Sequence, residues 1–377
     1  MPIKVNILST CRFHVCDLAR ELNRDGFDVK YYSYVPAMRS FAYGLPKKCS
    51  YSLFYILLPF LVLQKFLPFQ WTRILRMRFQ DFLTAIIMRR ADIVIAMSGE
   101  FVYALKRAKK RGEIIILERG SKHIIEQKKI LENIPSLKGN QTVPSFNFRR
   151  ELEGYSIADY ISIPSQHVKW SFLFYHYPVN KLFINPYGVD LTMFRPMPGI
   201  EKKYDFIMVG GWSYRKGCDL LIDAIQQTNY TILHVGPLVD LDFPKNKQFF
   251  HFDAVNQTQL VNYYNQAKIF VLPSREEGLA MVQAQAIACN LPLIGSKDSG
   301  AEDLKSLIGN TKYIMILEEY TLESLISILC HSMDLYKKTN GMIYPIDLLE
   351  KLSWESYGKR YANFINNNII NPLVELK

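Results

Sequence analysis

The chain has 377 residues, of which 49% are hydrophobic, and it carries a formal net charge of +11. This length allows two domains, each with a full core, and the composition excludes collagen-like, low-complexity and disordered proteins. The charge is uneven, because residues 1–190 hold 28 Lys and Arg against 15 Asp and Glu, and residues 191–377 hold 18 against 20. A basic first half implies an acidic partner such as an anionic membrane surface or carrier. A nucleic acid is not expected, because no helix-turn-helix, zinc-finger or RNA-binding signature accompanies the charge.

The six cysteines show neither a disulfide framework nor a zinc-ligand spacing. Reduced thiols fit a cytosolic protein. The first nine residues resemble a strand and lack the basic start and long apolar core of a signal peptide. We therefore expect a cytoplasmic protein.

The first half alternates between strand and helix patterns. Strands are expected at residues 3–9, 29–34, 91–98, 113–117 and 159–165, with helices at 13–24 and 166–176. This alternation predicts a parallel α/β unit. Arg12 follows the first strand and is a candidate phosphate contact, although a surface arginine is an equally good interpretation.

Residues 51–69 are the most apolar stretch of the chain. The uninterrupted run from Tyr51 to Leu63 is too short for a secure membrane span. Basic residues flank it: Lys47, Lys48, Arg73, Arg76, Arg78, Arg89 and Arg90. Two interpretations stay open, a segment that lies in an anionic membrane surface and a buried helix of the first domain.

Two further basic or polar clusters follow. Residues 106–111 contain five Lys and Arg, which suggests a solvated helix end or a contact with charged lipid heads. Residues 118–123 follow a predicted strand at the sheet edge where ligand groups collect. There, Arg119 and Lys122 are candidate anion contacts, and His123 is a candidate ligand contact or a ring satisfied by nearby backbone.

The second half opens with a glycine-containing turn between a strand at 204–210 and a helix at 218–226. Gly211 permits close approach of the backbone to a phosphate, and Lys216 can add a full charge. Further strands are expected at 230–236 and 249–254, and a helix at 259–267. Asp240 and Asp242 lie in a loop, and we expect no metal there.

Residues 268–295 form a strand–turn–helix–strand pattern, with an acidic turn at 276–278 and a helix at 279–288. In a parallel sheet, such a turn lies at the ligand-binding edge, and the amino terminus of the helix suits a phosphate. Glu277 would repel a phosphate, but its carboxylate can accept hydrogen bonds from sugar hydroxyls. A ligand that is both sugar and phosphate fits these residues. The alternative is an ordinary carboxylate at a helix start.

This stretch resembles the donor-site signature of the retaining glycosyltransferase family four, which has the GT-B fold. Glu277 and Gly278 match the Glu-Gly pair of the family. The second family glutamate, eight positions on, holds the nucleotide ribose, and Gln285 stands there instead. Residues 181–196 resemble the interdomain passage of the family, with matches at Asn185, Gly188, Val189, Asp190 and Phe194.

The resemblance implies an α/β protein of two Rossmann-like domains that face each other across a cleft. Residues 1–190 would form the acceptor-binding domain, residues 191–352 the donor-binding domain, and 353–377 a terminal segment crossing back to the first. In the family, an Arg and a Lys clamp the diphosphate. Lys216 matches the lysine, whereas Trp212 occupies the arginine position and Arg215 is the nearest substitute. The implied catalytic pair is Glu277 with His123 facing the donor sugar. The expected donor-binding residues are Gly211, Arg215, Lys216, Gly278, Leu279 and Gln285.

The expected function is metal-independent, retaining transfer of a hexosyl group from a nucleotide sugar to a hydroxyl acceptor, without a cofactor. The acceptor would be a glycan or lipid-linked glycan in bacterial surface-polysaccharide assembly, at the inner membrane face. Two alternatives remain. Trp212 and Gln285 would suit a non-catalytic GT-B partner protein that binds nucleotide poorly, and a nucleotide-sugar epimerase would share the fold.

Overall fold

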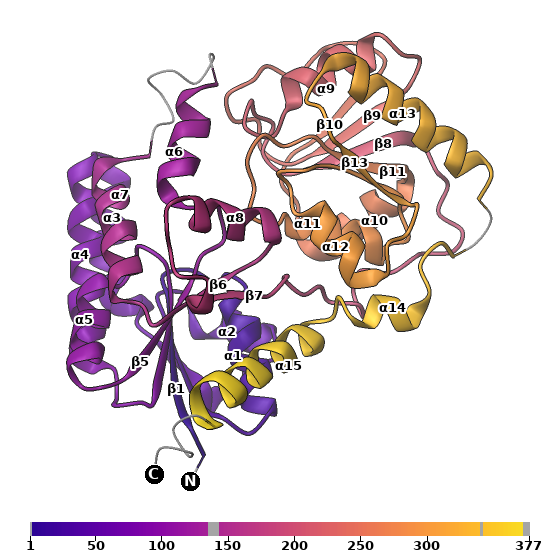
Figure 1. Ribbon diagram of the computed structural model, residues 1–377. Helices are drawn as coiled ribbons and strands as arrows, with labels where there is room; N and C mark the ends of the chain where they lie inside the picture. The colour runs from indigo at the N-terminus through magenta and orange to yellow at the C-terminus, as the bar shows by residue number, and fades with distance from the viewer. Residues whose placement is uncertain (1, 135–142, 340–341, 372–377) are drawn as a thin grey trace.

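The computed structural model describes residues 2–134, 143–339 and 342–371. Within these ranges, the chain forms two parallel sheets, each with helices on its faces (Figure 1). The first sheet has the strand order β3-β2-β1-β4-β5-β6-β7. Its strands are β1 (Lys4–Ser9), β2 (Asp28–Ser33), β3 (Ser50–Ser52), β4 (Ile93–Met97), β5 (Ile114–Glu118), β6 (Tyr160–Ile163) and β7 (Leu182–Ile184).

Eight helices accompany this sheet in the described part of the chain. They are α1 (Val15–Arg24), α2 (Ala37–Ala42), α3 (Phe54–Phe66), α4 (Gln70–Ile87), α5 (Val102–Lys110), α6 (Ile124–Glu132), α7 (Ser145–Ile157) and α8 (Gln166–Phe174). The central strands β1 and β4 are almost wholly buried, as strands covered on both faces must be. Their near-continuous apolar sequences are the reason that the pattern predicted them correctly to within a few residues.

The second sheet has the order β10-β9-β8-β11-β12-β13. Its strands are β8 (Tyr204–Val209), β9 (Ile232–Val235), β10 (Phe249–Phe252), β11 (Ala267–Leu272), β12 (Leu293–Ser296) and β13 (Ile314–Leu317). The α-helices that accompany this sheet in the described residues are α9 (Cys218–Gln226), α10 (Gln257–Gln266), α11 (Met281–Ala288), α12 (Ala301–Ile308), α13 (Leu322–Lys337) and α14 (Ile346–Glu350). Each sheet with its helices is called a unit below.

The terminal helix α15 (Trp354–Ile365) returns to the first unit and lies beside α1 (Figure 1). The two helices approach so closely that a Cβ on Gly358 would overlap the Cβ of Glu21. Farther along α15, the Tyr361 hydroxyl donates a 2.7 Å hydrogen bond to Glu118 at the end of β5. The predicted crossing of the terminal helix is therefore confirmed.

The apolar stretch 51–69 is not a buried helix, so that interpretation is wrong. It contains β3 and α3, and on α3 only Leu57 is buried. Tyr55 and Phe66 are 79% and 74% exposed. Among the described residues, no helix is both long and apolar enough to cross a membrane.

Candidate functional site

The second sheet has its topological switch point between β8 and β11. These strands are neighbours, and the chain then proceeds to β9 and β10 on one side and to β12 and β13 on the other. A crevice opens at the carboxyl ends of such strands, and ligands bind there in doubly wound folds. The turns 210–217 and 273–280 therefore meet where a ligand site is expected.

The two turns are in direct contact. Gly217 has a φ of +74°, which an L side chain rarely adopts, and a Cβ there would overlap the carbonyl oxygen of Pro273. Arg275 strengthens the contact by donating to both carboxylate oxygens of Asp219, at 2.6 and 2.8 Å. Gly217 thus allows the turn 210–217 and the turn 273–280 to pack together beside one crevice.

Glu277 faces two cations across this crevice. Its Oε1 forms an ion pair with Nζ of Lys216 and lies 3.4 Å from Nη2 of Arg215. The structure therefore brings together three of the predicted residues. The two positive charges offset the negative charge of Glu277, which would otherwise repel a phosphate.

Glu276 is a site residue that the sequence interpretation did not assign. It is fully buried, and its Oε2 accepts a 3.1 Å hydrogen bond from Nη1 of Arg215. Nε2 of Gln127, from the first unit, lies 3.4 Å from both Glu276 oxygens. Burial lowers the pKa of Arg215, but the carboxylates of Glu277 and Glu276 outweigh it and raise the pKa above its ordinary value. Arg215 is thus a shared partner of two carboxylates.

The first unit reaches directly onto the acidic turn. A Cβ on Gly278 would overlap the carbonyl oxygen of Gly120, and the Gly278 carbonyl accepts a 2.7 Å bond from Oγ of Ser165. Nε2 of His167 donates to the Glu277 carbonyl over 2.9 Å. Only a residue without a side chain fits at position 278, so this glycine serves contact between the two units.

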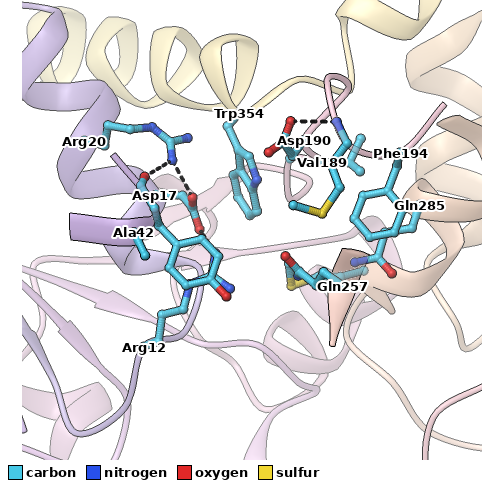
Figure 2. Close-up of a pocket in the computed structure, with 14 residues that line it drawn as sticks. Arg12, Asp17, Arg20, Ala42, Val189, Asp190, Phe194, Gln257, Gln285 and Trp354 are labelled. Atoms are coloured by element: carbon cyan, nitrogen blue, oxygen red, sulfur yellow. Dashed lines mark hydrogen bonds and ion pairs between the residues drawn. The ribbon is translucent and has the colours of Figure 1, made fainter. Parts of the chain in front are cut away.

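Gln285 lines a separate cavity of about 150 Å³ between the units (Figure 2). The Tyr264 hydroxyl donates a 3.1 Å hydrogen bond to Oε1 of Gln285. Met281 from the first turn of α11 lines the same cavity. The amide at the position of the missing glutamate therefore still presents an acceptor beside a hollow.

Arg12 lies on the opposite wall of this cavity (Figure 2). Its guanidinium stacks 3.2 Å above the ring centroid of Tyr43, and Nη2 donates to Asp17 over 3.0 Å. The structure thus places Arg12 and Gln285 around one hollow, with Arg12 held in place by its own unit.

The His123 ring packs among aromatic side chains of the first unit. The ring caps α6, where Nδ1 accepts a 3.4 Å hydrogen bond from the Ile125 N–H, and it stacks on Tyr175 with centroids 4.6 Å apart. Only 5% of the residue is exposed. Burial, with a smaller effect from Arg119, lowers the pKa of His123 to about 4. The predicted role of His123 against a donor sugar is not supported, because backbone and aromatic neighbours enclose the ring.

Arg119 and Lys122 are engaged in protein contacts rather than free for an anion. Arg119 is buried and donates to Glu151 over 2.8 Å, to Gln127 over 2.7 Å and to the Lys122 carbonyl. Nζ of Lys122 pairs with Asp298 of the second unit over 2.7 Å. In this structure Arg119 therefore supports the interior and Lys122 joins the two units, and their role as anion contacts stays a prediction.

Three further residues named in the sequence analysis, Trp212, Leu279 and Gly211, lie in packed parts of the second unit. Trp212 is fully buried against His234 and Phe243, so its side chain does not replace a clamp arginine. Leu279 is buried behind the acidic turn. A Cβ on Gly211 would lie 2.8 Å from the Val239 side chain, so this glycine permits packing against the following loop.

The aspartates of that loop also have structural contacts. Oδ1 of Asp240 accepts a 3.0 Å hydrogen bond from the Tyr214 N–H, and the Asp242 carbonyl accepts from Nε1 of Trp212 over 3.4 Å. Both bonds hold the loop against the turn 210–217.

The first sheet has an equivalent switch point between β1 and β4, which sequence reasoning did not assign. Oγ1 and the N–H of Thr10 both donate to the Glu100 carboxylate, at 2.7 and 3.1 Å. Burial raises the pKa of Glu100 to about 7. In the sequence, Thr10 and Glu100 each follow closely after a predicted strand. The same criterion selected Arg12 and His123.

This geometry, two facing units with a crevice at the carboxyl ends of their strands and a returning terminal helix, defines the GT-B fold. One solved structure that shares it is Anabaena HepE in complex with UDP-glucose, with a TM-score of 0.65 and 12% sequence identity, over 97% of this chain and 99% of that one. Such low identity shows the fold alone.

Residues 192–312 match the family model described as "Glycosyl transferases group 1". The chain therefore carries a domain of this family, and the domain contains Lys216, Glu277 and Gln285. An uncharacterized glycosyltransferase of Methanocaldococcus jannaschii is 28% identical over 112 residues, which cover 28% of this chain and 32% of that protein. "Probable sucrose-phosphate synthase" of Thermosipho melanesiensis is 26% identical over 218 residues, 51% of this chain and 49% of that protein. The chain thus matches half or less of the length of these relatives.

Proposed function

We propose that this protein is a retaining glycosyltransferase that moves a hexosyl group from a nucleotide sugar to a hydroxyl acceptor. The observation that carries the proposal is the placement of Arg215, Lys216 and Glu277 at the switch point of a group 1 domain. Two cations and a carboxylate in one crevice suit a ligand with both phosphate and hydroxyl groups.

In the proposed reaction, the bond between the anomeric carbon and the diphosphate oxygen breaks, and the acceptor oxygen forms the new bond. The acceptor hydroxyl gives its proton to an oxygen of the departing phosphate, and the nucleoside diphosphate leaves. Lys216 and Arg215, together with N–H groups at the start of α11, would stabilise the charge that grows on the leaving diphosphate. Glu277 would orient the sugar hydroxyls, and Gln285 would accept from the ribose. No metal or cofactor is required for these roles.

For the acceptor, the basic first unit supports a glycan or lipid-linked glycan at the inner face of a membrane, in surface-polysaccharide assembly. The nucleotide part of the donor is proposed by analogy with HepE, which was solved with UDP-glucose.

Thermal-shift screening against a panel of nucleotide sugars tests the proposal, followed by an assay for release of nucleoside diphosphate with and without acceptor glycans. A stabilising donor and acceptor-dependent release are the expected results. Stabilisation by none of the panel would instead favour the non-catalytic partner, the reading that Trp212 and Gln285 motivate. Conversion of the sugar nucleotide without acceptor would favour the epimerase.

A further inference from the structure

Helices α3, α4 and α5 form an outer face of the first unit, away from the second unit (Figure 1). This α3–α5 face exposes an unusual number of large apolar side chains. The most exposed include Tyr55, Phe66, Phe69, Trp71, Phe82 and Ile86. The face continues onto α5, because the Phe82 and Tyr103 rings lie 5.8 Å apart. Monomeric proteins rarely expose so many neighbouring apolar groups unless the patch binds something.

The charges on this face are almost all positive. On α3 and α4, Lys65, Arg73 and Arg78 are exposed. The one carboxylate of these two helices, Asp81, is buried and accepts hydrogen bonds from the N–H groups of Tyr103 and Ala104. The carboxylate therefore serves the interior and does not reduce the positive charge at the surface.

The exposed side of α5 adds further cations. Lys106, Arg107, Lys109 and Lys110 line a hollow of about 720 Å³ together with Tyr103. Lys106 and Lys109 also pair with Glu153 and Asp159 at the surface, so the net positive charge comes from Arg107 and Lys110 and from the exposed cations of α3 and α4. Apolar side chains bordered by cations are the composition that binds an anionic bilayer.

We infer that the α3–α5 face docks the protein on an anionic lipid bilayer, with apolar side chains inserted below the headgroups and Lys and Arg on the lipid phosphates. A second copy is the weaker occupant, because a two-fold contact would set one basic face against the same basic face. Leu57 is buried and Phe60 is stacked on Phe79 with centroids 4.5 Å apart, so Phe66 and Trp71 are better placed than either to insert into a bilayer.

Vesicle co-sedimentation tests the inference without any donor or acceptor. The probes are phosphatidylcholine vesicles with and without phosphatidylglycerol, at low and high salt. We expect binding to the anionic vesicles, with part of it resistant to salt. Lys65→Gln and Arg73→Gln should each weaken the partition coefficient about fivefold. The pair Phe66→Ser and Trp71→Ser should remove the salt-resistant part.

The matched control is the pair Trp170→Ser and Phe174→Ser on α8, which are 61% and 69% exposed, against 55% for Trp71 and 74% for Phe66. These changes remove equally exposed aromatic rings outside the α3–α5 face, so vesicle binding should persist. Quenching of Trp71 fluorescence by brominated acyl chains gives a second readout, which Trp71→Phe should abolish.

Three results would overturn the inference. The first is a wild-type protein that ignores anionic vesicles at low salt. The second is equal weakening by the control pair. The third is a dimer that dissociates in the Phe66→Ser and Trp71→Ser protein while vesicles are not bound, which would assign the face to a second copy. Because a missing glycosyl transfer changes none of these readouts, failure of docking and failure of the proposed function remain distinguishable.

Discussion

At the scale of single residues, Glu277 is the group on which the proposed chemistry depends most. Its carboxylate faces Lys216 and Arg215 at the switch point. Glu277→Gln keeps the shape but loses the charge, and Glu277→Ala loses both. We expect both to lower kcat by on the order of a hundredfold, because the contact to the donor sugar strengthens in the transition state. Steady-state release of nucleoside diphosphate measures this.

The control for this change is Glu302→Ala, which removes an exposed carboxylate from the first turn of α12. It should leave the rate unchanged, and circular dichroism should show all three variants folded. A Glu277→Ala enzyme with the wild-type rate would exclude this residue from the site.

The two cations beside Glu277 should behave differently. Lys216 pairs with Glu277, whereas Arg215 also balances the buried Glu276. Lys216→Met should therefore weaken donor binding by about 1.5–3 kcal/mol with little loss of stability. Arg215→Met should also destabilise the fold by about 3 kcal/mol or more, because it leaves a buried carboxylate without its cation. Calorimetry with the donor and urea unfolding separate the two effects. If Arg215→Met alone weakens donor binding, the assignment of the clamp is reversed.

Gln285 tests whether an amide has replaced the ribose-binding carboxylate. The Tyr264 hydroxyl already donates to its Oε1, so a carboxylate in Gln285→Glu would keep a partner. We expect this variant to bind nucleoside diphosphate at least as tightly as the wild type. Gln257→Glu adds the same charge to the same cavity from another helix and should not tighten binding. Clear weakening in Gln285→Glu, measured by calorimetry, would show that the pocket requires the amide.

At the scale of elements, periodicity and turn chemistry predicted the strands and helices well. The helix Cys218–Gln226 was predicted with its observed bounds, and β11 lies within a residue of its predicted start. The contacts between elements were less accessible. Glu276, rather than Glu277, is the fully buried carboxylate, and Gln127 of the other unit lies against it. The His123 ring is enclosed by aromatic rings, among them Tyr175, which is far from it along the chain. A pattern within one segment carries no information about such partners.

His123 at the start of α6 leads to a prediction about pH. An unfolded histidine has a pKa of 6.5, whereas the folded ring has a pKa of about 4. Between these values, the unfolded state holds more protons, so the free energy of unfolding falls as the pH falls, by about 1.4 kcal/mol per pH unit for one such ring. Above pH 6.5 this ring contributes no pH dependence.

Urea unfolding at about pH 7 and about pH 5 measures this loss. His123→Asn preserves a capping side chain but removes the titrating ring, so its loss between the two pH values should be smaller than that of the wild type. The comparison cancels the effects of Glu100 and Asp303, whose pKa values burial raises. An equal loss in both proteins would mean that the ring is protonated in the folded state.

At the scale of the whole molecule, the two units meet through the acidic turn itself. Gly278 lies against Gly120, His167 donates to the Glu277 carbonyl, and Lys122 pairs with Asp298. The GT-B arrangement could be predicted from sequence motifs, because each strand–turn–helix motif consists of consecutive residues. The contacts across the cleft could not be predicted, because they join residues more than 100 positions apart. The exposed α3–α5 face was indicated by the apolar run, but only the structure shows which side chains leave the core.

The central claim is that a nucleotide sugar binds where the turns 210–217 and 273–280 meet. Hydrogen exchange of the wild type and of Lys216→Met, with and without the nucleotide sugar that gives the largest thermal shift, tests it most directly. We expect protection of the peptides spanning both turns in the wild type and much weaker protection in the variant at the same ligand concentration. Protection confined to other segments, or equal protection in both proteins, would contradict it.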